Sequence, residues 1–257
     1  MIKNIKDSEI ENGRKVLKDH VVNPLTYEGA LESLYFCILS QATPWEKASE
    51  LIYKMRDVSH QKDKDARGKT SSLQVLSNKK VLNRILVENG WRFHHNKRLD
   101  ESCDHFANAN PKILDEIINA DENVREKYSY IKWLSRKTFS FWHLCLGGTN
   151  LLALDVYVMR GLSELGINMK ESYHTSKSRE DGQNVRGTPS KKEYLEIEAE
   201  ARSLFSKDKR FLQGDKVNMA LVDSVLWWKG ANRGDPQQVY LFGNGTRSWM
   251  LPYAECS

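Results

Sequence analysis

The stretch 130–164 constrains the fold most, because it predicts two consecutive helices that each begin with a chemically distinctive residue. An apolar, aromatic-rich helix is expected over Thr138–Leu146. The glycine pair at 147–148 can end it, since glycine readily adopts the left-handed conformation just past a helix. After a short apolar run, Asp155 occupies the N-cap position of the next helix. Lys137 and Asp155, eighteen positions apart, therefore open successive helices.

A lysine at a helix start is unusual, because the helix dipole makes that end positive. The same positive potential favours the neutral amine, whose lone pair can attack an electrophile. Taken singly, Lys137 also fits a solvated surface lysine. Asp155 likewise fits an ordinary N-cap.

The composition is that of an ordinary globular protein. The 257 residues suffice for one large or two small domains, and 40% hydrophobic residues can fill a core. The net charge of +5 permits a nucleic acid partner without demonstrating one. The four cysteines are far apart and form no CxxC pair, so we expect no metal site and no cofactor. Reduced thiols and a charged N-terminus without a signal peptide indicate an intracellular protein. The expected location is the cytoplasm or nucleoid of a prokaryote.

The rest of the chain predicts further helices and no strands. Helices are expected over 1–24, 27–40, 44–55, 72–77, 79–89, 99–109, 111–120, 122–130, 191–206 and 216–229. Ser190 and Glu193 form a capping box at the start of the helix over 191–206. Polar loops are expected over 59–73 and 167–190. We therefore predict an all-α fold of two helical lobes with a cleft between them. One lobe is 28–130, and the other is 1–27 plus 131–257.

Several segments resemble those of the helix-hairpin-helix DNA glycosylase and AP lyase superfamily, both in amino-acid sequence and in their order along the chain. They are S-Q-A-T-P-W-E-K-A at 40–48, G-W-R-F-H-H-N-K-R at 90–98, R-K-T-F-S-F-W at 136–142, L-D-V-Y-V-M-R at 154–160, E-I-E-A-E-A-R at 196–202 and L-V-D-S-V-L-W at 221–227. The match is most similar to the archaeal and bacterial 8-oxoguanine DNA glycosylases, and covers roughly residues 28–233. It implies the helix-hairpin-helix glycosylase architecture.

The resemblance also implies an activity and a set of site residues. Lys137 would form a Schiff base with the sugar, and Asp155 would assist it, which makes the chain a bifunctional glycosylase and AP lyase. Gln41 would fill the space left by the flipped base. The implied base-binding residues are Asp223, Trp227 and Trp228. The implied DNA contacts, besides Gln41, are Arg92, Lys97, Arg98, Lys132, Ser135 and Arg136.

The expected partner is double-stranded DNA that contains a damaged base, with no membrane and no need for more than a monomer. The sequence departs from the family pattern in one segment of four residues and at one single residue. Lys132-Trp133-Leu134-Ser135 stands where the family carries hairpin glycines, and Tyr157 stands where it often has histidine. Three hypotheses stay open: an 8-oxoguanine enzyme, the same scaffold acting on another modified or mismatched base, and a non-catalytic helical DNA-binding module.

Overall fold

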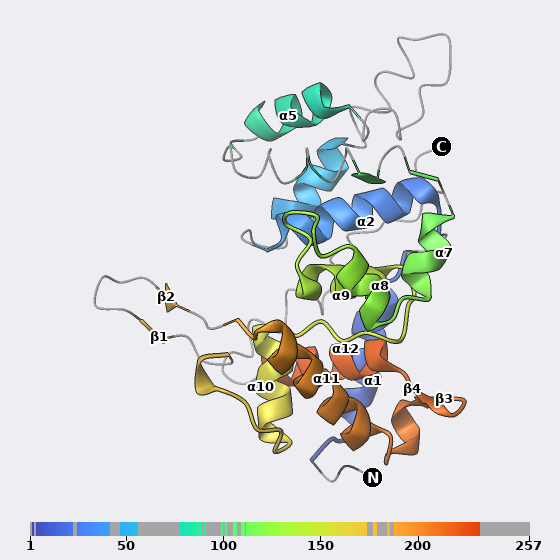
Figure 1. Ribbon diagram of the computed structural model, residues 1–257, viewed down its shortest axis with the longest axis vertical. Helices are drawn as coiled ribbons and strands as arrows, with labels where there is room; N and C mark the ends of the chain where they lie inside the picture. Colours follow the sequence, from blue (N-terminus) through green and yellow to red (C-terminus); the bar gives the residue numbers. More distant parts are fainter. Residues whose placement is uncertain are drawn as a thin grey trace. The chain divides into compact units, whose positions relative to one another are not determined.

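The computed structural model describes residues 2, 4–22, 25–41, 47–55, 78–88, 90, 99, 101, 105–106, 109–110, 112–173, 177–178, 184–185 and 188–231. The described residues are mostly helical (Figure 1), which confirms the predicted fold class. The α-helices are α1 Asp7–His20, α2 Tyr27–Leu39, α5 Lys79–Glu88, α7 Ile113–Ile118, α8 Glu122–Lys127, α9 Arg136–Cys145, α10 Val156–Glu164, α11 Lys191–Phe205 and α12 Met219–Ala231. Residues 47–55 are also helical, whereas the helix expected over 72–77 lies outside the described residues. Among the described residues, no helix has both the length and the apolar character needed to cross a membrane.

The remaining regular elements are short. In the part of the chain that the structure describes, two 3₁₀ turns, η2 Glu171–Tyr173 and η3 Lys209–Phe211, accompany two antiparallel hairpins. The hairpins pair β1 Lys177–Ser178 with β2 Asn184–Val185, and β3 Leu212–Gln213 with β4 Lys216–Val217. The second pairing corrects the expected start of the last helix at 216. Because Lys216 and Val217 pair with the preceding strand, α12 begins only at Met219.

The chain divides into two compact units. Unit 1 comprises residues 1–21, 119–122 and 147–257, and unit 2 comprises 22–118 and 123–146. The expected lobes differ from this division chiefly at 131–146, which falls in unit 2. The reason is that α9 packs on α2, where the Trp142 indole N–H donates to the Ala30 carbonyl at 2.9 Å.

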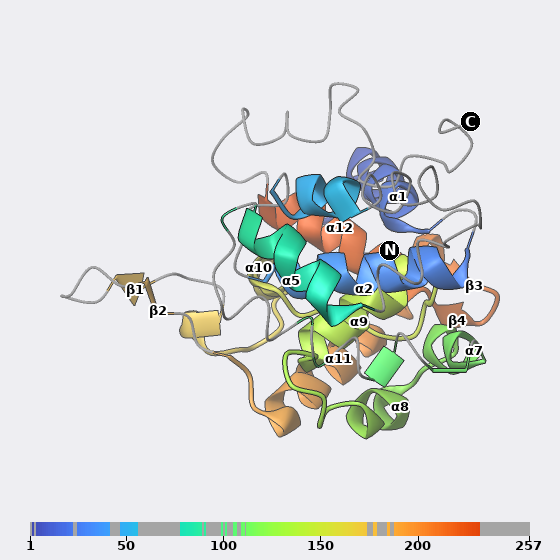
Figure 2. The same cartoon turned by 90° about the horizontal axis from the view of Figure 1, so that it is seen from above.

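Helix α12 forms the centre of unit 1, with α1 and α10 packed against it (Figures 1 and 2). Glycines permit this close packing. A Cβ added at Gly13 of α1 would lie 2.3 Å from Val225 Cγ2, and one added at Gly230 would lie 2.1 Å from the Tyr157 carbonyl oxygen. The apolar residues of α12 therefore join one core with those of α10 and α11.

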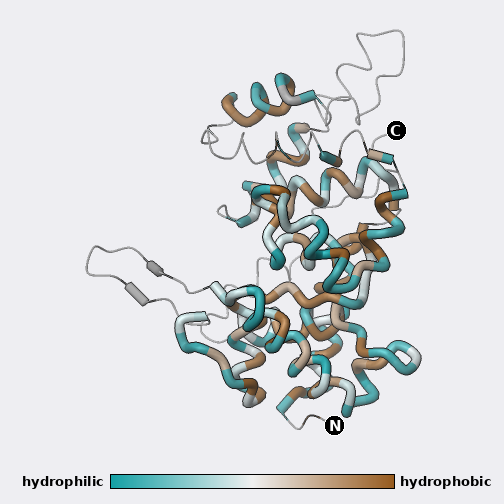
Figure 3. Tube along the Cα trace, in the orientation of Figure 1, coloured by the Kyte–Doolittle hydropathy of each residue, from teal (hydrophilic) through white to brown (hydrophobic). Residues whose placement is uncertain are grey.

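Unit 2 is built around α2, whose side chains from Gly29 to Leu39 are all buried. Aromatic rings fill the space beside α9: Tyr128 stacks on Phe139 at 5.7 Å, and Phe106 meets Trp142 edge-on at 5.0 Å. Apolar and polar residues alternate in short runs along helix α5, as Figure 3 shows, and this spacing places them on opposite faces of the helix. Burial of the apolar face is what stabilises such an amphipathic helix.

Candidate functional site

Lys137 lies in the first turn of α9, as its sequence position predicted, although the helix begins two residues earlier than expected. Ser135 is the N-cap, and its Oγ accepts from the Thr138 backbone N–H at 3.2 Å. The start moves because Ser135 satisfies a helix N–H that would otherwise lack a partner. Lys137 is half-buried, and its ammonium makes no hydrogen bond or ion pair with any residue the structure describes. Helix α9 thus fixes the backbone of Lys137, while no described residue binds its ammonium group.

The turn before α9 contains a bulky residue in a conformation that favours glycine. The Leu134 N–H donates to the Ile131 carbonyl at 3.1 Å, and Trp133, third in this four-residue turn, has a φ of 74°. Positive φ at this position is typical of type II turns, where glycine or asparagine usually stands. A left-handed conformation costs a residue with a side chain about 1–2 kcal/mol. Trp133 therefore occupies a turn that must be held by its surroundings.

Helices α8 and α9 and the turn between them form a hairpin over 122–145, and two of its cations besides Lys137 have partners within unit 2. Arg136 donates two hydrogen bonds to Glu126 of α8, at 2.6 and 2.8 Å. This bidentate pair joins the two hairpin helices through two N–H groups at the edge of the planar guanidinium. The Lys132 ammonium lies 5.5 Å from the centre of the Trp133 ring, in a cation–π contact. Of these two predicted DNA contacts, Lys132 is exposed and Arg136 is half-buried in its pair.

Gln41 is bound to the same hairpin. It follows α2, and its Nε2 donates to the Trp133 carbonyl at 2.8 Å and to Thr138 Oγ1 at 2.9 Å. Both partners are more than 90 residues away in sequence. The structure thus brings Gln41, Ser135 and the start of α9 together, as sequence reasoning had not foreseen.

Asp155 is the N-cap of α10, which confirms the predicted position. Its Oδ1 accepts from the backbone N–H groups of Tyr157 and Val158, both at 2.8 Å. The side chain is half-buried. A carboxylate here satisfies two helix N–H groups and complements the helix dipole.

The segment 151–154, just before Asp155, is buried without regular secondary structure, and side chains form hydrogen bonds with its backbone. Glu198 accepts from the Leu152 N–H at 2.7 Å, and the Tyr194 hydroxyl donates to the Leu152 carbonyl at 2.7 Å. Asp223 accepts from the Ala153 N–H at 2.8 Å. Without such partners, buried peptide groups would cost several kcal/mol in lost hydration, roughly 1–3 for each. These side chains fix the path of the chain into α10.

Sequence reasoning missed Glu198, although a signal was present. It lies four residues after Tyr194 and so shares a helix face with this large aromatic residue, and a carboxylate on a buried face needs a partner. Asp223 was predicted to bind the base. It is buried, with 5% of its surface exposed, and one of its oxygens contacts the Ala153 N–H. Its observed contact is therefore with the segment that leads to Asp155.

Aromatic side chains lie beside the start of α10. The Tyr157 and Trp227 rings meet edge-on at 5.8 Å, and the Arg160 guanidinium lies 5.6 Å from the Tyr157 ring centre. Arg160 also donates to the Gly230 carbonyl at 3.0 Å. Trp227 and Trp228 are both half-buried at the end of α12. Unit 1 therefore gathers Asp155, an aromatic pair and the end of α12.

Burial shifts the pKa values of two side chains, one in α9 and one packed against it. It lowers the pKa of His143, whose Nδ1 lies 2.7 Å from the Ile117 carbonyl. The imidazole is neutral and donates to that carbonyl. Burial, reinforced by a hydrogen bond to Glu116, raises the pKa of the Tyr128 hydroxyl. Both groups stay uncharged at neutral pH and act in packing.

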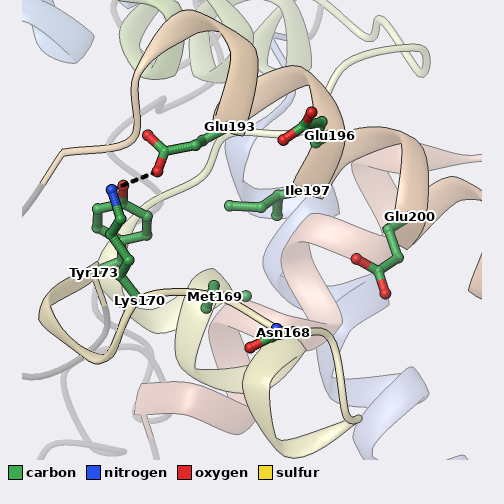
Figure 4. A pocket seen from close by; sticks show the side chains of 8 residues that line it. All are labelled: Asn168, Met169, Lys170, Tyr173, Glu193, Glu196, Ile197 and Glu200. Atoms are coloured by element: carbon green, nitrogen blue, oxygen red, sulfur yellow. Dashed lines mark ion pairs between the residues drawn. The ribbon is translucent and has the colours of Figure 1, made fainter.

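A cavity of about 570 Å³ in unit 1 is lined by none of the predicted site residues. Figure 4 shows its wall from α11 and the loop at 168–173, with Lys170 paired to Glu193 at 2.7 Å. Glu196 and Glu200 add two further carboxylates. This excess of negative charge repels DNA phosphates. The cavity therefore does not fit the nucleobase pocket that the sequence predicts.

Three predicted DNA contacts, Arg92, Lys97 and Arg98, lie outside the described residues. Within the described part of the chain, no three His, Cys, Asp or Glu side chains group as metal ligands would. Cys37 and Cys145 are buried and are not part of a disulfide.

Comparison with solved structures identifies the fold. The chain is similar to the Methanocaldococcus jannaschii 8-oxoguanine glycosylase/lyase in complex with a 15mer DNA that contains 8-oxoguanine. The TM-score is 0.55, the identity is 17%, and the alignment covers 88% of this chain and 91% of that one. The 8-oxoguanine DNA glycosylase of the same organism aligns with a TM-score of 0.53 and 18% identity, over 87% of this chain and 85% of that one. No protein family matches the sequence, and neither does any curated protein. The chain has the helical fold of these DNA glycosylases.

Proposed function

We propose that the protein is a bifunctional DNA glycosylase and AP lyase that flips out and excises a damaged base, with 8-oxoguanine as the first candidate. The observation that carries the proposal is the placement of Lys137. In a chain with a DNA glycosylase fold, a half-buried lysine stands in the first turn of α9, and its ammonium has no partner among the described residues. This placement supports a role for the Lys137 amine as the nucleophile.

The chemistry assigns different tasks to an amine and a carboxylate. A base inside a duplex is out of reach, so the enzyme must first extrude it at a cost of about a few kcal/mol. The neutral Lys137 amine then attacks C1′, and the electrons of the glycosidic bond leave with the base. The Asp155 carboxylate stabilises the positive charge that develops on the sugar and helps to manage the lysine proton. The attached nitrogen then loses a proton, the C1′–O4′ bond breaks and O4′ takes up a proton, so that the opened sugar is held as an imine. The imine permits loss of a C2′ proton and cleavage of the C3′–O bond, whose electrons leave with the phosphate, and this nicks the strand.

The end of α12 is proposed to recognise the base. Trp227 or Trp228 offers a ring for stacking, and stacking on an aromatic side chain contributes about 1–3 kcal/mol per base. The Asp223 carboxylate, which accepts from the Ala153 N–H, is proposed to accept from base N–H groups as well. The Tyr157 ring supports Trp227 edge-on and would fix its orientation.

Borohydride trapping on abasic duplex DNA tests the nucleophile. Wild-type protein should form a covalent cross-link, and Lys137→Gln should abolish it. Lys127→Gln is the matched control: it removes one charge from the same hairpin, but its ammonium is paired with Glu116 at 2.6 Å. Absence of a wild-type cross-link would leave the alternative of a non-catalytic DNA-binding module.

A panel of single-lesion duplexes then defines the substrate. Excision of 8-oxoguanine supports the leading hypothesis. Excision only of an oxidised pyrimidine, a mismatch or a phage-modified base supports the same scaffold with another specificity. The departures at Trp133 and Tyr157 are the reason to include these substrates.

A further inference from the structure

Gln41 binds the chain of unit 2 on both sides of Lys137, at Trp133 before it and at Thr138 after it. One amide hydrogen of its Nε2 goes to the Trp133 carbonyl and the other to Thr138 Oγ1. A side-chain amide has only two N–H donors, so both are used. The carbonyl of Trp133 can only accept, which fixes the amide nitrogen toward the hairpin.

The first contact holds a turn that is otherwise unfavourable. The carbonyl that Gln41 binds belongs to Trp133, the residue with positive φ. Tryptophan has no intrinsic preference for this conformation, so bonds from outside the turn must maintain it. Gln41 supplies such a bond from the end of α2.

The second contact continues into the helix cap. Thr138 Oγ1 lies 2.7 Å from Ser135 Oγ, and Ser135 caps α9. Lys137 stands between these two residues. Its side chain gains no orientation from a partner among the described residues, so the position of its backbone sets the region that the amine reaches. A shift of this turn would move the amine with it.

We propose that Gln41 is a positioning residue for Lys137, which holds the Trp133 turn and the first turn of α9 in register. The inference rests on the proposed lyase function. It gives Gln41 a task different from filling the space of a flipped base, because both donors of its amide are used inside the protein.

Single-turnover trapping on abasic DNA separates the two tasks. Gln41→Met keeps the length of the side chain but has no donor, and Gln41→Ala serves as a second variant if methionine disturbs folding. A single-stranded abasic oligonucleotide has no opposite base and no stack to fill. We expect the trapping rate to fall about 10- to 100-fold on both duplex and single strand, as for a small misplacement of a reacting group. Affinity for a duplex with a tetrahydrofuran site should stay unchanged.

A rescue variant and a local control complete the test. Trp133→Gly removes the side chain that makes the turn unfavourable, so we expect the double variant Gln41→Met/Trp133→Gly to trap at about the rate of Trp133→Gly alone. This comparison uses abasic duplex DNA, so it does not require the single-stranded oligonucleotide to be a substrate. Ser40→Ala, which loses only a bond to the Cys37 carbonyl, should trap like wild type.

Each outcome decides the matter. A defect of Gln41→Met on duplex alone, a normal rate on both DNAs, or a double variant as slow as Gln41→Met would overturn the positioning role while leaving the lyase intact. If wild-type protein traps on no abasic DNA, the proposed function fails instead.

Discussion

Alanine at Gly230 should destabilise the protein, although glycine to alanine within a helix usually stabilises it. The added Cβ would lie 2.1 Å from the Tyr157 carbonyl oxygen and 2.8 Å from its carbon, both backbone atoms. A relaxed carbon–oxygen contact is about 3.3 Å, so α10 and α12 must separate by roughly 1 Å there. Such overpacking costs about 3 kcal/mol, and the higher helix propensity of alanine returns about 1. The net loss of about 2 kcal/mol predicts a Tm lower by roughly 4–8 °C.

The same displacement reaches the candidate site, since Tyr157 adjoins the Asp155 cap and contacts Trp227. Under the proposed function, excision at 25 °C should fall about 100-fold for a shift of this size. Gly13→Ala is the control: its Cβ would lie 2.3 Å from Val225 Cγ2, on the α1 face of the same helix. It should lose similar stability but keep excision within about threefold, because the defect lies at a different contact. A Gly230→Ala protein with a Tm equal to or above that of wild type would refute the packing argument.

Three further predictions concern single side chains. Asp155→Ala should lose about 1 kcal/mol of stability in urea, whereas Asp155→Asn keeps the cap. Excision by Asp155→Asn should still fall about 10²- to 10³-fold with unchanged DNA affinity, and an equal loss of DNA binding would indicate a capping role alone. Burial lowers the pKa of His20 to about 4 from 6.5. The unfolded chain then binds a proton that the folded state excludes, so stability on the order of 3 kcal/mol should be lost as the pH falls from 6.5 to 4. Urea titrations should show a weaker loss for His20→Gln, and an unchanged pH dependence would contradict this. The Arg210 bonds hold the pKa of buried Asp208 below its usual range. Asp208→Asn should therefore lower the free energy of unfolding by about 2 kcal/mol at pH 7. Below pH 4, the variant should lose less stability on further acidification than the wild-type protein does.

Local rules predicted the features that depend on neighbouring residues. The capping box of Ser190 and Glu193, the cap at Asp155 and the helix stop at Gly147 are all present. Each needs only a few adjacent residues and satisfies backbone groups that any helix end exposes. For the same reason, the sequence located Lys137 at a helix start.

Features that depend on distant segments could not be predicted. The backbone N–H groups of 152 and 153 bind side chains 46 and 70 residues away. Trp133 takes a glycine-like conformation that its own identity disfavours, supported by Gln41 from 92 residues upstream. No local propensity encodes such contacts, because tertiary packing determines them.

The residues of the two units become available at different stages of translation. Apart from the short piece 119–122, unit 2 is one stretch that ends at residue 146, so all of its chain has emerged well before translation stops. Helix α1 packs on α12, which is synthesised about 200 residues later. On the ribosome, the apolar face of α1 must therefore wait for its partner, and until then this helix is open to chaperones and to off-pathway association.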